Sequence, residues 1–399
     1  MRPLLTIGFL FSLLCLAPQQ SFSQSGQGEI DFYGVSIRLP INYEAAIYEG
    51  PLTASSITSY IGGLDTATLQ HYLEALLRYK EVHRPDDWLF YQLVRKVAQY
   101  ISPKADNYYR YTFYKWWFLT RSGYNAKLTL SKDYLLFYVQ CDEAIYNIPY
   151  RMEDSKQYVC LNYHDYGTID FSKHRFADVT PTHNTAAGKP FSYKVNQLPH
   201  FELSDYTEKD VQFSDGLNRY TFRIKLNPQV KTIFTNYPVV DYNLQFNMPL
   251  SKTTHESLIP SLKKEVRRLK QKDGVEFLMR FTRYAFLFKP DVEVFGTEKR
   301  LSAEQTLLHE FSDCEDRAAL FFFLVKEIYN LPMLVLTFPK HVTVAVQFDK
   351  PFGQTIEYGG MRYSICEPSP QAVDLRIGQA IPELAKEAYQ VAYAYQPVK

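Results

Sequence analysis

The feature that most constrains the fold is the order in which two hydrophobic patterns follow one another along the chain. Apolar residues first recur at spacings of three and four, which is typical of helices, and later alternate as in short strands. This order occurs between residues 64 and 165 and again from residue 276 onward. Helices grouped ahead of strands predict an α+β fold.

The two regions have the same kinds of expected elements. In the first, helices are expected at 64–102 and 112–120, and strands at 126–130, 134–140 and 157–161. In the last, helices are expected at 276–286, 303–310 and 313–329, and strands at 333–338, 342–348 and 361–366. Placed over each other without gaps, the regions align Asn107 with Cys314 and Tyr134 with His341. We therefore predict that the first region is a degenerate copy of the last.

Between these regions the helical period disappears. Alternating or aromatic-rich runs at 191–195, 220–226 and 242–248 predict a small β-rich region. Its tyrosines are either a glycan-binding or peptide-binding surface or ordinary strand residues. A basic amphipathic helix, with its charges in solvent, is expected at 251–272 and to end at Gly274. The expected divisions are a signal peptide (1–23), an N-terminal module (24–165), the β-rich region (166–258) and a C-terminal module (259–399).

The first residues indicate export. Arg2 precedes an apolar run from Leu4 to Ala17, and small residues follow at Ser21 and Ser23, so a signal peptide cleaved after Ser23 is predicted. The run is shorter than the roughly 20 apolar residues of a membrane span. We expect a secreted or periplasmic protein with no transmembrane span in the mature chain. Because Lys and Arg total 44 against 43 Asp and Glu, no nucleic-acid partner is expected.

The cysteines do not form a disulfide scaffold. After cleavage only Cys141, Cys160, Cys314 and Cys366 remain, which is few for an exported chain of this length. Cys141 and Cys160 either pair or are two buried thiols. Cys366 is either a buried strand thiol or the partner of Cys314 in an inactivating disulfide. Without Cys-x-x-Cys, His-Glu-x-x-His or a glycine-rich phosphate loop, neither a metal nor another cofactor is predicted.

The strongest local signal surrounds Cys314. Ser312 and Glu315 have the spacing of a capping box, which predicts a helix starting at Asp313 with Cys314 in its first turn. The helix end favours a thiolate and could hold an oxyanion. Asp313, Glu315 and Asp316 oppose the thiolate, so a partner base is needed.

His341 is the expected base. It opens the alternating strand that ends near Phe348, and Glu367 directly follows the next strand, 361–366. Antiparallel pairing of these strands would bring Glu367 beside His341, where it could fix the imidazole tautomer. The expected catalytic residues are therefore Cys314, His341 and Glu367.

These residues also carry a family resemblance. The motif from Asp313 to Ala318 resembles the Cys motif of transglutaminase-like cysteine enzymes, a branch of the papain-like thiol fold. The segment 286–312 resembles what precedes that motif in bacterial members. His341 matches the family His, and Glu367-Pro368-Ser369 resembles the family's Asp-Pro-Thr. The resemblance covers residues 276–375 and implies a C-terminal transglutaminase-like domain, preceded by a degenerate one.

The sequence departs from the family in two respects. Glu367 stands where Asp is usual, which makes Asp374 a second candidate for the acid. Eukaryotic relatives use a Trp near the oxyanion, but Trp88, Trp116 and Trp117 all lie in the first half of this chain. The expected oxyanion donors are therefore the Cys314 backbone N–H and, as a weaker second, Gln305.

The expected function is acyl transfer or hydrolysis on protein or peptide amides, such as cell-wall or surface peptides, through a Cys314 thioester. Hydrolysis by a peptidase or amidase is favoured over cross-linking, although the sequence leaves the acceptor open. The alternative is a non-catalytic cell-envelope scaffold or a glycan-binding or protein-binding protein built on the same folds.

Overall fold

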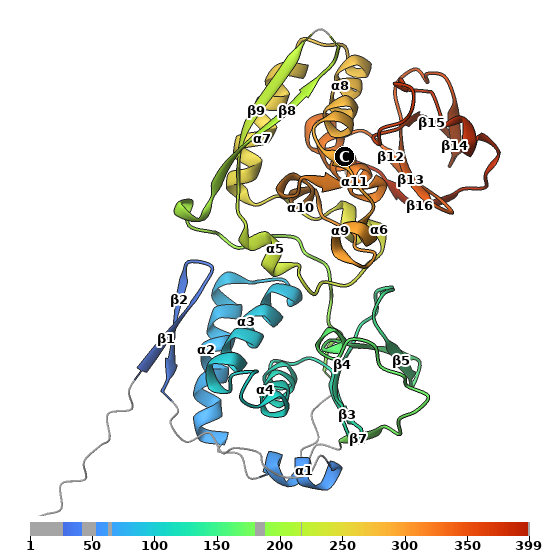
Figure 1. The fold of residues 1–399 in the computed structure, drawn as a ribbon. Helices are drawn as coiled ribbons and strands as arrows, with labels where there is room; N and C mark the ends of the chain where they lie inside the picture. The colour runs from blue at the N-terminus through green and yellow to red at the C-terminus, as the bar shows by residue number, and fades with distance from the viewer. Residues whose placement is uncertain (1–26, 42–52, 63–65, 180–187, 217, 398–399) are drawn as a thin grey trace, which may run out of the picture.

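The computed structural model describes residues 27–41, 53–62, 66–179, 188–216 and 218–397. The predicted signal peptide lies outside these residues. Figure 1 shows two modules, one formed by the first half of the chain and one by the second, each with helices packed beside a sheet. The α+β class predicted from the sequence is confirmed. In the part of the chain described here, no helix is long and apolar enough to cross a membrane.

The N-terminal module begins with an antiparallel hairpin and continues with helices before strands. The hairpin consists of β1 (Gln27–Phe32) and β2 (Val35–Pro40). The helices are α1 (Ala54–Gly62), α2 (Thr66–His83), α3 (Asp87–Ile101) and α4 (Tyr108–Arg121). The strands are β3 (Ala126–Leu130), β4 (Leu135–Gln140), β5 (Tyr150–Glu153), β6 (Lys156–Cys160) and β7 (Ala177–Val179).

The C-terminal module follows the same plan. Its helices are α7 (Lys252–Val266), α8 (Gln271–Tyr284), α9 (Asp291–Phe295), α10 (Ala303–Leu308) and α11 (Cys314–Tyr329). Its main strands are β12 (Met333–Phe338), β13 (His341–Val346), β14 (Thr355–Tyr358), β15 (Met361–Cys366) and β16 (Gln390–Tyr395). A short parallel pair, β10 (Leu287–Phe288) and β11 (Phe311–Ser312), leads into α11.

The two five-stranded sheets have the same topology. The N-terminal sheet has the order β5-β6-β4-β3-β7 and the C-terminal sheet the order β14-β15-β13-β12-β16. Within both, every pair of neighbouring strands is antiparallel. Matching strands also occur in the same chain order after a capped helix, α4 in one module and α11 in the other. This agreement supports an internal repeat far better than sequence identity does.

The strands of the middle region are divided between the modules and do not share one sheet. β7 pairs with β3, whereas the hairpin of β8 (Thr207–Ser214) and β9 (Arg219–Leu226) packs its apolar face into the C-terminal core with α7 and α8. α5 (Gln229–Ile233) packs on the N-terminal module, where the Ile233 carbonyl accepts a hydrogen bond from Trp88 Nε1.

Three local predictions in this part of the chain were wrong. Residues 242–248, expected as a strand, contain the short helix α6 (Tyr242–Phe246), and 191–195 belongs to no strand. Gly274 does not end a helix but lies inside α8, where an added Cβ would come 1.7 Å from the Tyr329 hydroxyl. Its lack of a side chain therefore serves the close packing of α8 against α11, which the local sequence pattern does not reveal.

Candidate active site

Cys314 is the first residue of α11, but the cap that starts this helix differs from the predicted one. Asp313 is the N-cap, and its side chain accepts a hydrogen bond from the Asp316 backbone N–H. The predicted capping box of Ser312 and Glu315 is therefore wrong. Ser312 lies in β11, and its strand pairing leaves Asp313 as the residue that makes the turn into the helix. The thiol is still placed at a helix N-terminus, as expected.

A buried arginine fixes the start of α11. Arg317 has no solvent exposure, and its guanidinium donates to four backbone carbonyls. The acceptors lie at the end of α8, just after it and in β11: Thr282, Arg283, Phe286 and Ser312. Because a guanidinium is a rigid fork of donors, this contact sets the angle at which α11 leaves the strand.

His341 and Glu367 meet as the sequence predicted. β13 and β15 pair antiparallel, and His341 Nε2 lies 2.8 Å from Glu367 Oε2. Glu367 is only 1% exposed, and its other carboxylate oxygen accepts the Ser369 backbone N–H at 2.8 Å. Arg283 donates to the Glu367 backbone carbonyl, so both the main chain and the side chain of Glu367 are fixed.

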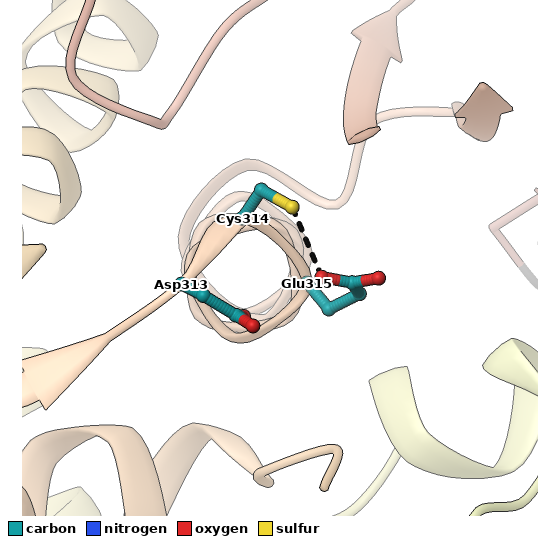
Figure 2. A group of neighbouring side chains, drawn as sticks. All are labelled: Asp313, Cys314 and Glu315. Atoms are coloured by element: carbon teal, nitrogen blue, oxygen red, sulfur yellow. Dashed lines mark hydrogen bonds between the residues drawn. The ribbon is translucent and has the colours of Figure 1, made fainter. Parts of the chain in front are cut away.

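The thiol and the imidazole lie on adjacent elements. The backbone N–H of Val342, the residue after His341, interacts with the Cys314 thiol. The thiol proton, however, is directed toward Glu315, whose Oε2 lies 3.0 Å from Sγ (Figure 2). Among the described residues no hydrogen bond joins Cys314 to His341. Engagement with His341 would require rotation of the thiol away from Glu315.

The electrostatics of the resting site favour a neutral thiol. Burial, followed by the charge and hydrogen bond of Glu315 and the charge of Asp313, raises the pKa of Cys314 well above its ordinary value. Burial acts to lower the pKa of His341, but the hydrogen bond and charge of Glu367 outweigh it and the net pKa is raised. In this geometry the proton therefore stays on sulfur.

An acidic cluster beside the thiol was not anticipated from the sequence. Asp291, Asp313 and Asp316 are all buried, and each offers a carboxylate oxygen within 4.8 Å of the others. Asp316 Oδ2 has no hydrogen-bond partner among the described residues. Asp313, Cys314 and Glu315 form an overlapping group (Figure 2). Carboxylates are ligands that hard divalent cations prefer, so these residues are the ones that could hold a metal.

This cluster escaped the sequence analysis because its members come from separate elements. Asp291 begins α9, whereas Asp313 and Asp316 belong to the start of α11. Burial, followed by the charges of Glu298 and Glu315, raises the pKa of Asp291, and burial, followed by the charges of Glu315 and Asp291, raises that of Asp313. The only sequence signal was the density of acids around Cys314, with nothing to indicate that Asp291 would join them.

The remaining candidates have other partners. Asp374, the second candidate acid, accepts hydrogen bonds from Arg283 and Tyr284. Gln305 forms a capping box with Ser302 at the start of α10, where its Oε1 accepts the Ser302 backbone N–H and its backbone N–H donates to the Ser302 hydroxyl. Cys141, Cys160 and Cys366 are buried free thiols and Cys314 is a partly exposed one, so neither suggested disulfide is formed.

The N-terminal module has different residues at the matching positions. Tyr108 is the first residue of α4, as Cys314 is of α11, and its N-cap Asn107 corresponds to Asp313. Leu135 opens β4 where His341 opens β13. The gap-free alignment that placed Asn107 on Cys314 is therefore displaced by one residue, because the helix caps rather than chance identities define equivalence. Both matching positions lack a thiol and an imidazole.

Comparisons with known proteins give no relative. No protein-family model, no curated protein and no solved structure matches this chain. Its function is therefore inferred from the geometry of its own residues.

Proposed function

We propose that the protein is a thiol enzyme that transfers an acyl group from a protein or peptide amide to water, as a peptidase or amidase, or to an amine. The proposal extends to the family suggested by the sequence motif around Cys314, the transglutaminase-like branch of the papain-like fold, and to an exported location. The C-terminal module would be catalytic and the N-terminal module structural.

The observation that carries the proposal is the 2.8 Å contact between His341 and Glu367, formed where β13 starts and next to the helix that begins with Cys314. Burying a carboxylate almost completely costs free energy unless the carboxylate is hydrogen-bonded or paired with a charge. Glu367 offsets this cost by holding the imidazole of His341 in one orientation. Nucleophilic sites require such an orienting group behind the base.

The geometry defines the roles of the two ring nitrogens. Because Nε2 of His341 is engaged by Glu367, Nδ1 is the nitrogen left to accept the Cys314 proton. Sulfur then attacks the amide carbonyl, the C–N bond breaks, and the leaving amine takes the proton from Nδ1. Water or an amine attacks the resulting thioester, gives its proton to His341, and releases the Cys314 thiol.

Backbone donors at the start of α11 would hold the negative oxygen formed during both attacks. The first N–H groups of a helix have no partner within the helix, and here the Asp313 side chain takes that of Asp316. The donors of Cys314 and Glu315 precede it and lie beside the thiol. Their use as an oxyanion hole explains why the nucleophile is the first helical residue.

The decisive experiment is alkylation of the full chain by iodoacetamide as a function of pH, with each modified cysteine mapped by mass spectrometry. Cys141, Cys160 and Cys366 are buried and serve as internal references. We expect Cys314 to be labelled fastest, and H341A to slow its labelling at pH 7 at least about tenfold.

H255A is the matched control, because His255 forms a similar pair with Glu327 at 3.1 Å but lies on α7. It should leave the labelling of Cys314 unchanged. Equal rates in the native chain and H341A, with titration near the free-thiol value of about 8.5, would overturn the proposal.

A second candidate function is a binding or scaffold protein. The specific observation in its favour is the Cys314 thiol, which donates to Glu315 rather than to His341 and has a raised pKa. This reading requires that C314A retains the protein's biological activity, whereas the enzyme reading requires loss. If C314A abolishes the activity, incubation with a labelled primary amine and a glutamine peptide distinguishes acyl transfer from hydrolysis. Incorporation of the amine indicates transfer, and cleavage without incorporation indicates hydrolysis.

A further inference from the structure

A second polar site lies in the N-terminal module, away from Cys314. It is a pocket of about 520 Å³ bounded by the β1–β2 hairpin, α3, α4 and α5. Pockets of this size hold small molecules. The side chains that matter for its chemistry come mainly from α3 and the turn after it: Gln92, Arg95, Gln99 and Lys104.

The two glutamines present donors to this pocket because their oxygens are already engaged. Gln92 Oε1 accepts a hydrogen bond from Arg95 Nη1 at 3.0 Å, and Gln99 Oε1 accepts from the Lys104 backbone N–H at 3.0 Å. Gln92 is only 9% exposed, and its Nε2 has no hydrogen-bond partner among the described residues. A buried donor without a partner is costly, so this amide indicates an acceptor that enters from outside the chain.

Positive charge accumulates behind the same wall. Lys104 Nζ lies 2.6 Å from Asp165, and the fully buried Lys115 Nζ lies 3.8 Å from the other oxygen of the same carboxylate. Arg95 adds a third cation close enough to lower the pKa of Lys115, as does Lys104, although burial is the main cause. Burial lowers the pKa of Lys115 to about 7, so Lys104 and Arg95 supply most of the positive charge around this carboxylate at neutral pH.

The other acid at the pocket does not restore the balance. Asp31 is part of the lining, where its Oδ1 accepts the Gly34 backbone N–H, but its single negative charge is outnumbered by those of Arg95, Lys96 and Lys104. Tyr33, which is partly exposed, supplies an aromatic surface against which a sugar ring can pack. The wall therefore combines donors, excess positive charge and an aromatic side chain.

We propose that this pocket binds a small hydroxylated acid, of the sugar-acid or sugar-phosphate class, whose carboxylate or phosphate oxygens accept from Gln92, Arg95 and Lys104. Oxyanions match the guanidinium geometry and accept from the ammonium and amide donors of the wall. The hydroxylated body would lie against Tyr33. This site is independent of Cys314 chemistry.

The test is isothermal titration calorimetry of the full chain with three probes of one sugar skeleton: glucuronate, glucose 6-phosphate and glucose. We expect one or both anions to bind with a Kd of about 1 mM or tighter and glucose to bind at least tenfold more weakly. The stronger of the two anions identifies the source of the oxyanion. Absence of binding by both anions, or equal binding of glucose, would overturn the proposal.

Two variants locate the site. R95M should weaken anion binding at least tenfold, whereas K156M, which alters an exposed lysine on β6 of the same module, should not change it. Q92L removes the buried donor without adding charge or volume and should also weaken binding several-fold, and Trp88 fluorescence on α3 reports whether either variant is folded. Unchanged affinity in folded Q92L and R95M would place the anion elsewhere and contradict the proposal.

Discussion

The two modules share a sheet order and a capped helix, yet they use the start of that helix in opposite ways. In the C-terminal module, α11 begins with a thiol beside a His–Glu pair. In the N-terminal module, α4 begins with Tyr108, whose hydroxyl donates to Asp165 at 2.9 Å and accepts from Asn162 at 2.8 Å. The same backbone therefore supports either a group that could react or a group that is fixed.

The difference lies in how completely polar groups are satisfied. Asn162 accepts from the Phe137 backbone N–H and donates to the Leu135 carbonyl, while Asp165 pairs with Lys104 and Lys115. These contacts bind the start of α4 to the sheet. At the start of α11, by contrast, Asp316 Oδ2 has no partner in the described part of the chain, and the thiol donates to the adjacent Glu315. Unsatisfied groups in a buried site are typical of functional positions.

The largest expected effect concerns Arg317, whose guanidinium fixes the start of α11 through four backbone carbonyls. R317A leaves four buried backbone carbonyls without their donor and should destabilise this module by about 3 kcal/mol or more. All three tryptophans lie in the N-terminal module. Urea unfolding followed by tryptophan fluorescence should therefore stay unchanged, whereas the labelling of buried Cys366 should begin at a lower urea concentration.

R268A, which alters an exposed arginine just after α7, is the control and should change neither transition. If R317A shifts the fluorescence transition by as much as the Cys366 transition, the two modules unfold as one unit. The expected independent unfolding of the C-terminal module would then be wrong.

The next effect concerns the group that keeps the thiol protonated. Glu315 raises the pKa of Cys314 by its charge and by accepting the thiol proton, so E315Q should lower that pKa and increase the alkylation rate at neutral pH by roughly tenfold, the equivalent of one pKa unit. E327Q, the same substitution at the far end of α11, is the matched control. An unchanged rate in E315Q would mean that Glu315 does not hold the proton.

A smaller effect is expected for the imidazole. Glu367 raises the pKa of His341, so E367Q should lower that pKa, and the ring should lose its proton at a lower pH. The measurement is an NMR titration of labelled histidine, with H341A used to assign the resonance. E357Q, on exposed β14, should leave the titration where it is. A His341 curve unmoved in E367Q would exclude Glu367 as its orienting acid.

The smallest effect tests whether the first module retains a latent site. Y108C, made in the C314A background, puts a thiol at the position matching Cys314, but Leu135 stands where a base would be needed. We expect it to be labelled no faster than an ordinary thiol at any pH, within about twofold. Rapid labelling below pH 7 would show that the frame alone activates a cysteine and that His341 is dispensable.

Much of the secondary structure followed from local pattern alone. The strands predicted at 126–130, 333–338 and 361–366 coincide with β3, β12 and β15. Short apolar runs bounded by turn residues are typical of buried strands. The pairing of His341 with Glu367 was also predictable, since β13 and β15 lie close in the chain and antiparallel pairing brings the start of one strand to the end of the other. Contacts between elements that lie close together in the chain could thus be predicted from the sequence.

Contacts between distant elements could not. The β8–β9 hairpin joins the C-terminal core through α7 and α8, and the acidic cluster needs Asp291 of α9 beside the start of α11. Nothing in a local window encodes either contact. No local window predicts the pocket around Gln92 either, because its lining comes from the β1–β2 hairpin and from α3, α4 and α5.

The sequence by itself determined the α+β order, the place of Cys314 in the first turn of a helix and the strand ends at His341 and Glu367, because each depends on periodicity, on the residue types at a helix start or on the pairing of strands close in the chain. Only the tertiary structure decided which atoms the Cys314 thiol meets. Its proton points to Glu315, its pKa is raised by burial and by nearby acids, and the imidazole next to it is held by Glu367. Protonation and orientation depend on distances and burial set by the packing of α11 against β13, and no one-dimensional pattern contains them.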